Sequence, residues 1–257
     1  MFCFHERITG ARGTIQVAFT DREGGHSTGS MGSLNLGRTD VDELAAVRAN
    51  GELVRRALGA ELLVATHQVH GREVLVADES FLSGWGRDSW LGEAAGGPPL
   101  PQADAIVTDR PGIALVVRVA DCVPVLLADA TGGVLGVAHA GRAGVDLGVL
   151  EATVTAMRRL GAGRIEAVVG PHVCAGCYEV PPQMAEQLET RHPGIRATTR
   201  WGSDSLDLGG ACGRQLEALG VGWRSVGGCT MTTPVLHSHR RDGDGAGRLA
   251  GLVCRVS

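Results

Sequence analysis

Apolar residues along this chain fall mostly in short uninterrupted runs, separated by polar and glycine-rich segments. Four of these runs follow one another closely, at residues 105–108, 113–119, 123–127 and 134–138. Short apolar runs bounded by glycine, proline or aspartate are typical of buried β-strands. Because turns as short as those between them usually join antiparallel strands, the four runs predict an antiparallel meander.

Helical spacing of apolar residues predicts a helix between Asp40, as its N-cap, and Gly59, as its C-terminal stop. A second helix is predicted from about residue 145 to 160, and shorter helices near 182–190 and 210–219. Further strands are predicted at residues 14–20, 62–66, 73–77, 165–169, 225–226 and 249–255.

Two long segments are predicted as loops, and neither separates two domains. Residues 21–37 are polar and rich in glycine and serine, which favours a surface loop, and residues 80–103 are rich in glycine and proline. No segment has the composition of an interdomain linker, and no period repeats. The sequence therefore predicts one α+β domain over residues 1–257, with mixed, largely antiparallel sheets.

Composition narrows the classes of partner. The 257 residues include 44% hydrophobic residues and carry a formal net charge of −4, so neither a basic nucleic-acid-binding face nor a membrane span is expected. Every basic residue is arginine, which excludes Schiff-base chemistry and the P-loop lysine. The first residues lack the pattern of a secretory signal, and seven cysteines is an odd number, so we expect reduced thiols and a cytoplasmic protein.

Three residues capable of metal or nucleophilic chemistry lie at the edges of apolar runs: His70, Cys122 and His139. One thiolate and two imidazoles suit Zn²⁺ with a fourth position open for catalysis, and ligand softness permits copper as well. The metal-free alternative makes Cys122 a nucleophile with His139 as its base. His67 is the nearest competitor as a ligand, and we interpret it as a supporting residue. Asp121, beside the thiol, is expected to orient a ligand or exchange a proton.

Two other motifs have weaker interpretations. Cys174 and Cys177 have the spacing of half a zinc ribbon or of a redox pair, but no second such motif exists, which favours two ordinary loop cysteines. A reversible disulfide and an adventitious metal are the remaining alternatives. The basic loop at residues 237–243 reads as a solvated turn that offers Arg240 or Arg241 to a phosphate.

Taken together, these segments resemble the laccase-domain (YfiH-like) family, once called multicopper polyphenol oxidases and now regarded as purine nucleoside phosphorylases. The resemblance runs nearly end to end, through motifs at residues 33–37, 67–71, 104–105, 120–124, 138–141, 170–171, 177–180 and 240–243. It implies a layered α/β/β/α fold and zinc held by His70, Cys122 and His139, which are also the catalytic residues.

The resemblance also implies phosphorolysis of adenosine, inosine, guanosine and 5′-methylthioadenosine, with adenosine deamination as a further activity. Asn35, Arg142, Arg240 and Arg241 are the expected contacts to nucleoside and phosphate, in a monomer or homodimer. The alternatives are a copper-dependent polyphenol oxidase, a metal-free Cys-His hydrolase and a degenerate nucleoside-binding protein. At two positions the chain differs from the family pattern, which weakens the prediction of phosphorolysis. Arg142-Ala143 stands where the family has Trp-Arg, and Gly51 stands where many relatives have an arginine.

Overall fold

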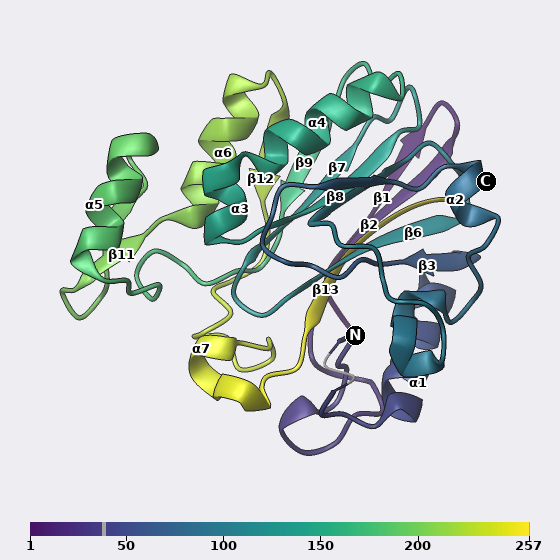
Figure 1. Cartoon of the computed structure of the whole chain (residues 1–257), viewed down its shortest axis with the longest axis horizontal. Coiled ribbons are helices and arrows are strands. Elements are labelled where there is room, and N and C mark those ends of the chain that lie inside the picture. Colours follow the sequence, from purple (N-terminus) through teal and green to yellow (C-terminus); the bar gives the residue numbers. More distant parts are fainter. Residues whose placement is uncertain (38–39, 257) are drawn as a thin grey trace.

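The computed structural model describes residues 1–37 and 40–256, and it packs two β-sheets face to face between layers of helices (Figure 1). The five-stranded sheet has the order β1 (Phe2–Gly10), β2 (Gly13–Thr20), β13 (Leu249–Val256), β6 (Ile113–Val119) and β3 (Leu62–Val64). The six-stranded sheet has the order β12 (Gly222–Ser225), β9 (Glu166–Val169), β7 (Val123–Ala128), β8 (Leu135–Ala140), β5 (Ala105–Thr108) and β4 (Val74–Val76). A two-stranded sheet pairs β10 (Arg196–Thr198) with β11 (Asp204–Leu206).

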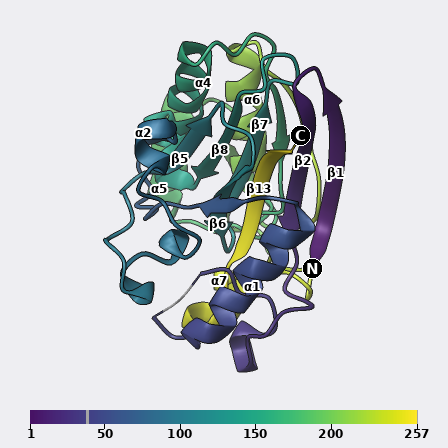
Figure 2. The same cartoon turned by 90° about the vertical axis from the view of Figure 1, so that its right-hand side faces the viewer.

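Helices cover the outer face of each sheet. The α-helices are α1 (Leu44–Ala57), α2 (Glu79–Leu82), α3 (Arg142–Leu147), α4 (Val149–Arg159), α5 (Pro182–Arg191), α6 (Leu208–Ala218) and α7 (His239–Asp242). The 3₁₀ turns are η1 (Gly29–Met31), η2 (Ser89–Ala95) and η3 (Gly243–Gly245). Both views place α4 and α6 at the end of the molecule opposite α1 and α7 (Figure 2). The layered α/β/β/α fold with mixed, largely antiparallel sheets is therefore confirmed.

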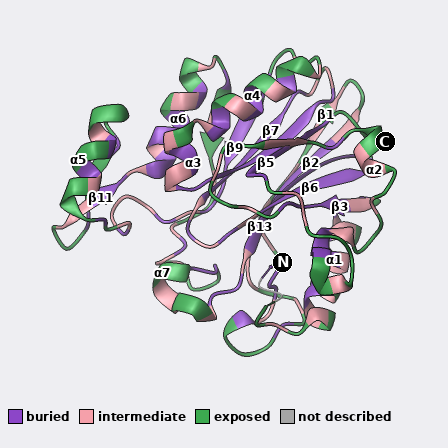
Figure 3. Ribbon diagram, viewed as in Figure 1, coloured by how far each residue is buried: buried purple, intermediate pink, exposed green. Residues whose placement is uncertain are grey.

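The core lies in three apolar layers, and the central strands are buried on both faces (Figure 3). Phe19, Val117 and Leu126 meet between the two sheets. Met157 of α4 packs on the outer face of the six-stranded sheet, and Val54 of α1 packs outside the other. Each such side chain, fully buried, contributes about 1.5–3 kcal/mol to folding.

The predicted meander is wrong, although the strands were placed well. β6 belongs to the five-stranded sheet, whereas β5, β7 and β8 belong to the six-stranded one. A strand buried on both faces has no polar alternation, so its sequence does not reveal which sheet it joins. As a result, the short connection from β6 to β7 crosses between the sheets, and this connection contains Cys122.

Several element boundaries also differ from prediction. The first helix starts at Leu44 instead of near Asp40, and the predicted helix at 145–160 is two helices separated by Gly148, whose φ is 81°. The segment at 80–103 contains η2, where Trp90 is only 3% exposed. Within the supposed surface loop at 21–37, Leu34 is fully buried.

Three strands were not predicted. β1 alternates between half-buried and exposed residues at the edge of its sheet, a weaker signal than the continuous runs. β10 and β11 are three-residue strands with little apolar character. In the part of the chain that is described, no helix is both long and apolar enough to cross a membrane.

Candidate metal centre

His70, Cys122 and His139 come together although they are far apart in sequence. One ligand atom from each lies within 4.8 Å of the others, so the three side chains could hold a metal ion. Cys122 Sγ lies 3.7 Å from His70 Nε2, and the two imidazole centroids are 4.7 Å apart. His139 is buried, Cys122 half-buried and His70 exposed, so the group opens to one side.

Local backbone geometry places each ligand. His139 lies in β8 opposite Pro124 of β7, and Cys122 directly precedes β7, so the pairing of these two strands brings Cys122 and His139 together. His70 has a φ of 61° and Asp121 one of 92°, conformations that cost non-glycine residues about 1–3 kcal/mol. Backbone strain of this kind concentrates at functional sites, and here it adjoins two of the three ligands.

One buried carboxylate orients both histidines. Asp104 accepts hydrogen bonds from the backbone N–H groups of Val69, His70 and Gly71, at 3.1, 2.9 and 2.7 Å. Its Oδ1 also lies 2.8 Å from His139 Nδ1, and its side chain is 0% exposed. The ionised carboxylate makes Nδ1 the donor, which leaves Nε2 of His139 free as a ligand. This role of Asp104 was not predicted from the sequence, although the residue lies in the motif at residues 104–105.

The charges of the group favour a thiolate. Burial raises the pKa of the Cys122 thiol, but hydrogen bonding and charge from His139, and then from His70, lower it to about 6. Burial lowers the pKa of His139, but its hydrogen bonds to Asp104 and Cys122 raise it to about 9. A thiolate beside imidazoles suits both a soft metal ion and a cysteine nucleophile.

Gly141 leaves space for the group. A Cβ at this position would lie 2.8 Å from His70 Cδ2 and 3.1 Å from Cys122 Sγ. Any side chain there would push the ligands apart. The absence of a side chain at Gly141 therefore leaves room for His70 and Cys122 to approach each other.

His70, Cys122 and His139 line a cavity of about 740 Å³, a size typical of small-molecule sites. Its walls are formed by Gly37, Asp40, His67, Gln68, His70, Arg118, Val119, Ala120, Asp121, Cys122, His139, Tyr178, His239, Arg240 and Arg248. His67 lies on the cavity wall but outside the group of three side chains that could hold a metal ion.

Three arginines, Arg118, Arg240 and Arg248, line this cavity together with the carboxylates of Asp40 and Asp121. Arg118 is held by a hydrogen bond to the Thr66 carbonyl, and burial together with the charge of Arg248 lowers its pKa to about 10. Arg240 stacks on the Tyr178 ring, with its guanidinium carbon 4.4 Å from the ring centroid. Arg118, Arg248 and Tyr178 were not predicted, because each lies in or beside an apolar or loop segment that offers no local signal.

The residues predicted to contact substrate divide into two groups. Arg240 lines the cavity, and Arg142 lies close enough to Tyr178 for its charge to lower the pKa of that phenol, which burial raises. Asn35, by contrast, is fully buried, bonds to Asp42 and accepts from the N–H groups of Gly37 and Arg248. Asn35 therefore supports the cavity wall without lining the cavity.

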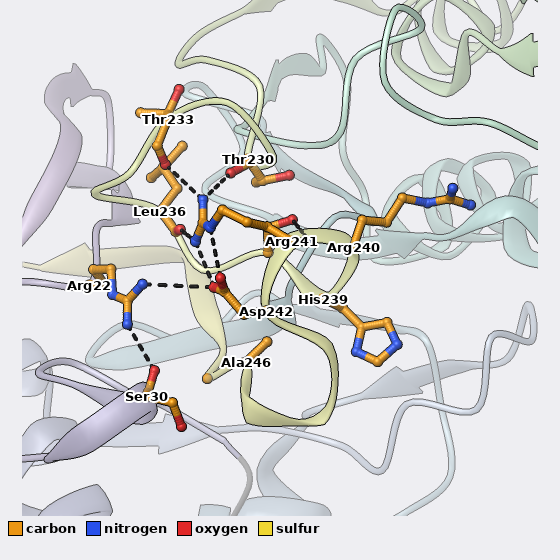
Figure 4. Close-up of polar contacts among 12 residues, drawn as sticks. Arg22, Ser30, Thr230, Thr233, Leu236, His239, Arg240, Arg241, Asp242 and Ala246 are labelled. Atoms are coloured by element: carbon orange, nitrogen blue, oxygen red, sulfur yellow. Dashed lines mark hydrogen bonds and ion pairs between the residues drawn. The ribbon is translucent and has the colours of Figure 1, made fainter. Parts of the chain in front are cut away.

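The Arg241 side chain, like that of Asn35, is engaged in contacts within the protein and does not line the cavity. Its guanidinium donates to the carbonyls of Thr230, Thr233 and Leu236 and pairs with Asp242, which in turn lies 3.8 Å from Arg22 (Figure 4). The Arg240 side chain extends away from these contacts (Figure 4). Arg241 thus fixes the loop that presents Arg240.

Asp121 is engaged in the same loop. Its Oδ1 accepts from Thr230 Oγ1 at 2.6 Å, and its Oδ2 accepts from the Arg240 backbone N–H at 2.7 Å. The carboxylate beside Cys122 therefore joins the β6–β7 connection to α7. Of the two roles expected for it, orientation of the site agrees with these contacts.

Packing against Trp90 explains why position 51 is glycine. A Cβ there would lie 2.2 Å from Trp90 Cζ2, and the position lines a separate hollow over α1, away from the metal ligands. An arginine in its place would collide with Trp90 before reaching any ligand in the described cavity. The departure at this position therefore reflects packing.

Comparison with known proteins identifies the family of this chain. Residues 16–256 match the family described as multi-copper polyphenol oxidoreductase laccase. A purine nucleoside phosphorylase of Streptomyces griseus is 45% identical over 252 residues, covering 96% of this chain and 97% of its own. An adenosine deaminase of an unknown prokaryotic organism is 36% identical over 172 residues, covering 64% and 63% respectively.

A solved structure agrees as well. The crystal structure of YlmD from Geobacillus stearothermophilus matches with a TM-score of 0.81 and 27% identity, covering 95% of this chain and 92% of its own. The match extends over both sheets and the helices around them, because almost the whole chain is covered. This chain therefore belongs to the multi-copper polyphenol oxidoreductase laccase family.

Proposed function

We propose that this protein is a zinc-dependent purine nucleoside phosphorylase, which converts a purine nucleoside and phosphate to the free base and ribose 1-phosphate. Its substrate class comprises adenosine, inosine, guanosine and 5′-methylthioadenosine. The observation that carries the proposal is a His-Cys-His group at the wall of an arginine-flanked cavity, in a chain 45% identical to a named purine nucleoside phosphorylase.

The donor set fits zinc. Catalytic zinc has three protein ligands of the nitrogen, sulfur or oxygen type and one open position, and its histidine ligands usually donate their second N–H to a carboxylate. His139 makes that contact to Asp104, and the cavity lies on the open side of the group. Bound Zn²⁺ would act as a Lewis acid that polarises a substrate or water oxygen.

The arginines suit the phosphate. Arg118 and Arg248 carry like charges at one cavity, where burial and, second to it, the charge of Arg248 lower the pKa of Arg118, and an anion bound beside Arg118 would offset both effects. Guanidinium groups bind phosphate oxygens in a bidentate manner. Arg240, fixed from behind by the backbone contact to Asp121, adds a third cation.

The reaction needs little proton chemistry from the chain. A phosphate oxygen forms a bond to C1′ of the ribose while the bond from C1′ to the purine nitrogen breaks. The electron pair of the broken bond leaves with the base, and the proton carried by the attacking phosphate passes to that purine nitrogen. The chain positions the two reactants and balances the phosphate charge, which are the contributions that an arginine-lined, largely pre-formed cavity supplies.

Adenosine deamination is the second candidate activity, because a relative 36% identical over part of the chain is named adenosine deaminase. The same cavity and ligands would serve, with water in place of phosphate as the attacking species. One incubation separates the two activities, since phosphorolysis gives adenine and deamination gives inosine.

The His-Cys-His set would also bind copper. Oxidation of polyphenols by several coppers needs more ligands than these three, and the other cluster found among the described residues consists of cysteines only. Metal analysis and oxygen uptake with a phenolic substrate test this alternative directly.

The deciding experiment incubates zinc-loaded protein with adenosine, with and without phosphate, and separates the products by chromatography. Adenine formed only with phosphate supports phosphorolysis, and inosine in either case supports deamination. Cys122→Ser should lose both the zinc of this site and turnover, whereas Cys3→Ser, on the edge strand β1, should keep both. Full turnover by Cys122→Ser would refute the proposal.

A further inference from the structure

A second group of metal-ligating side chains lies outside the cavity just described. Cys174, Cys177 and Cys229 place their sulfur atoms within 4.8 Å of one another, and all three are free thiols. Cys174 and Cys177 lie in the loop after β9, and Cys229 lies after β12, so the group joins two segments that are about fifty residues apart. The sequence motif contains only Cys174 and Cys177, and by itself it favours ordinary loop cysteines.

The spacing of the sulfurs suits one shared cation. Thiolates bound to one zinc ion at about 2.3 Å lie about 3.8 Å apart, which is within the separation seen here. Three thiols cannot all be satisfied by one disulfide. Three sulfur donors with no carboxylate or imidazole in the group select soft metal ions over Mg²⁺ or Ca²⁺.

Neighbouring groups stabilise a negative charge on the sulfur atoms of Cys229 and Cys174. The backbone N–H of Cys174 donates to Cys229 Sγ at 3.3 Å, and Arg200 Nη2 lies 4.0 Å from Cys174 Sγ. Burial raises the pKa of the Cys229 thiol, but these contacts with Cys174 and those with Thr232 lower it to about 7, whereas burial and the two neighbouring cysteines raise the pKa of the Cys177 thiol to about 12. Backbone N–H groups and a nearby cation are the usual partners of metal-bound thiolates.

The group also lies behind the cavity wall. Thr230, next to Cys229, donates to the Asp121 carboxylate, and the N–H of Val173, next to Cys174, donates to the Asp121 carbonyl. Tyr178 follows Cys177 directly and lines the cavity. Joining the two segments at the sulfurs would therefore fix the wall that carries Tyr178 and the loop that presents Arg240.

We propose that Cys174, Cys177 and Cys229 form a second metal site, which binds a thiophilic cation, Zn²⁺ or Cu⁺, and fastens these two segments together. Its three protein ligands leave the fourth position of a bound Zn²⁺ to a non-protein ligand. The site takes no part in the chemistry proposed for the cavity, although it fastens two segments that support the cavity wall.

The test measures metal content after reduced protein is loaded with Zn²⁺ and freed of loosely bound ions. The unmutated protein and Cys3→Ser should each hold about two ions per chain, Cys174→Ser and Cys122→Ser about one, and the double variant about none. With Co²⁺ as probe, the sulfur-to-metal absorption should be stronger in Cys122→Ser, which keeps three thiolates, than in Cys174→Ser. Competition for Cu⁺ under reducing conditions then decides which of the two cations binds more tightly.

A measurement on the unmutated protein keeps the proposal testable if a variant misfolds. Zn²⁺ should slow alkylation of Cys174 and Cys229, located by mass spectrometry, while leaving Cys3 unaffected. Equal zinc content in the unmutated protein and Cys174→Ser would overturn the proposal. A disulfide between two of these cysteines in the unreduced protein, detected as a mass lower by two hydrogens, would overturn it as well.

Discussion

Asp104 and His139 are linked twice in this structure. The Asp104 carboxylate lies 2.8 Å from His139 Nδ1, and the Asp104 carbonyl accepts the His139 backbone N–H at 2.7 Å. Because β5 and β8 are neighbours in the six-stranded sheet, the pairing of these strands sets the position of both residues. The same carboxylate accepts three N–H groups of the segment containing His70, so one side chain orients two proposed ligands.

Asp104→Asn should therefore weaken metal binding without removing a ligand. An amide has one acceptor oxygen, so its NH₂ group would face N–H donors that the carboxylate now satisfies. We expect the zinc affinity of the cavity site to fall about 10–100-fold, with a similar loss of turnover at limiting zinc. Competition with a chelator measures the affinity, and Asp109→Asn, an exposed carboxylate near the end of β5, is the control. Unchanged affinity would mean that Asp104 does not orient the ligands.

Gly141→Ala should separate the ligands by simple crowding. The new Cβ would lie 2.8 Å from His70 Cδ2, so the imidazole must move. We expect loss of bound zinc and turnover, with a decrease of about 1–3 kcal/mol in the free energy of unfolding. Gly84→Ala, where a Cβ meets nothing within 4 Å, is the matched control. An alanine variant that keeps full zinc content would show that His70 is not held where the structure places it.

Arg240 and Arg241 should respond in opposite ways to removal. Arg241→Ala removes the donor to three backbone carbonyls and leaves Asp242 with the more distant Arg22, so the free energy of unfolding should fall by about 1–3 kcal/mol. Arg240→Ala should change stability little but lower kcat/KM about tenfold, mainly through a higher KM for phosphate. Urea unfolding and initial rates at varied phosphate give both numbers. If Arg241→Ala raised the phosphate KM at unchanged stability, the two assignments would have to be exchanged.

The strands of this fold were predictable, but their pairing was not. The runs at β5 and β6 were placed to the residue, because uninterrupted apolar runs bounded by turns have few other interpretations. Which sheet each strand joins depends on contacts between residues distant in sequence, such as Leu249 with Val119, and no local pattern contains them. The edge strand β1 was missed because only one of its faces is covered.

The candidate site shows the same division. His70, Cys122 and His139 were found because each interrupts or ends an apolar run, where a polar residue is costly unless it is used. Arg118 was not predicted, because it lies inside a strand. Its position at the cavity depends on hydrogen bonds to Gln68 and Thr66, which are distant in sequence. Cys229 escaped notice because nothing in its own segment indicates that Cys174 and Cys177 lie next to it.

Gly51 and Trp90 should show strong coupling. Gly51→Ala places a Cβ 2.2 Å from the indole, so the free energy of unfolding should fall by about 1–3 kcal/mol despite the better helix propensity of alanine. In a Trp90→Ala background the obstacle is gone, and the same change should stabilise α1 by up to about 1 kcal/mol. A double-mutant cycle by urea unfolding measures the difference. Equal effects in both backgrounds would be incompatible with this packing.

Alkylation of Cys122 should distinguish a metal ligand from a free nucleophile. The pKa of this thiol is lowered to about 6, so in the metal-free protein its thiolate fraction, and with it the rate of reaction with iodoacetamide, should rise as the pH increases through about 6. At pH 7 most of the sulfur is then thiolate, and Zn²⁺ should block the reaction by occupying it. Mass spectrometry of the modified peptide follows Cys122 separately from the other cysteines. Cys212, whose pKa burial raises to about 12, should stay unreactive throughout and serves as the internal control. Rapid alkylation of Cys122 that excess Zn²⁺ does not slow, accompanied by loss of turnover, would instead identify a cysteine-dependent enzyme.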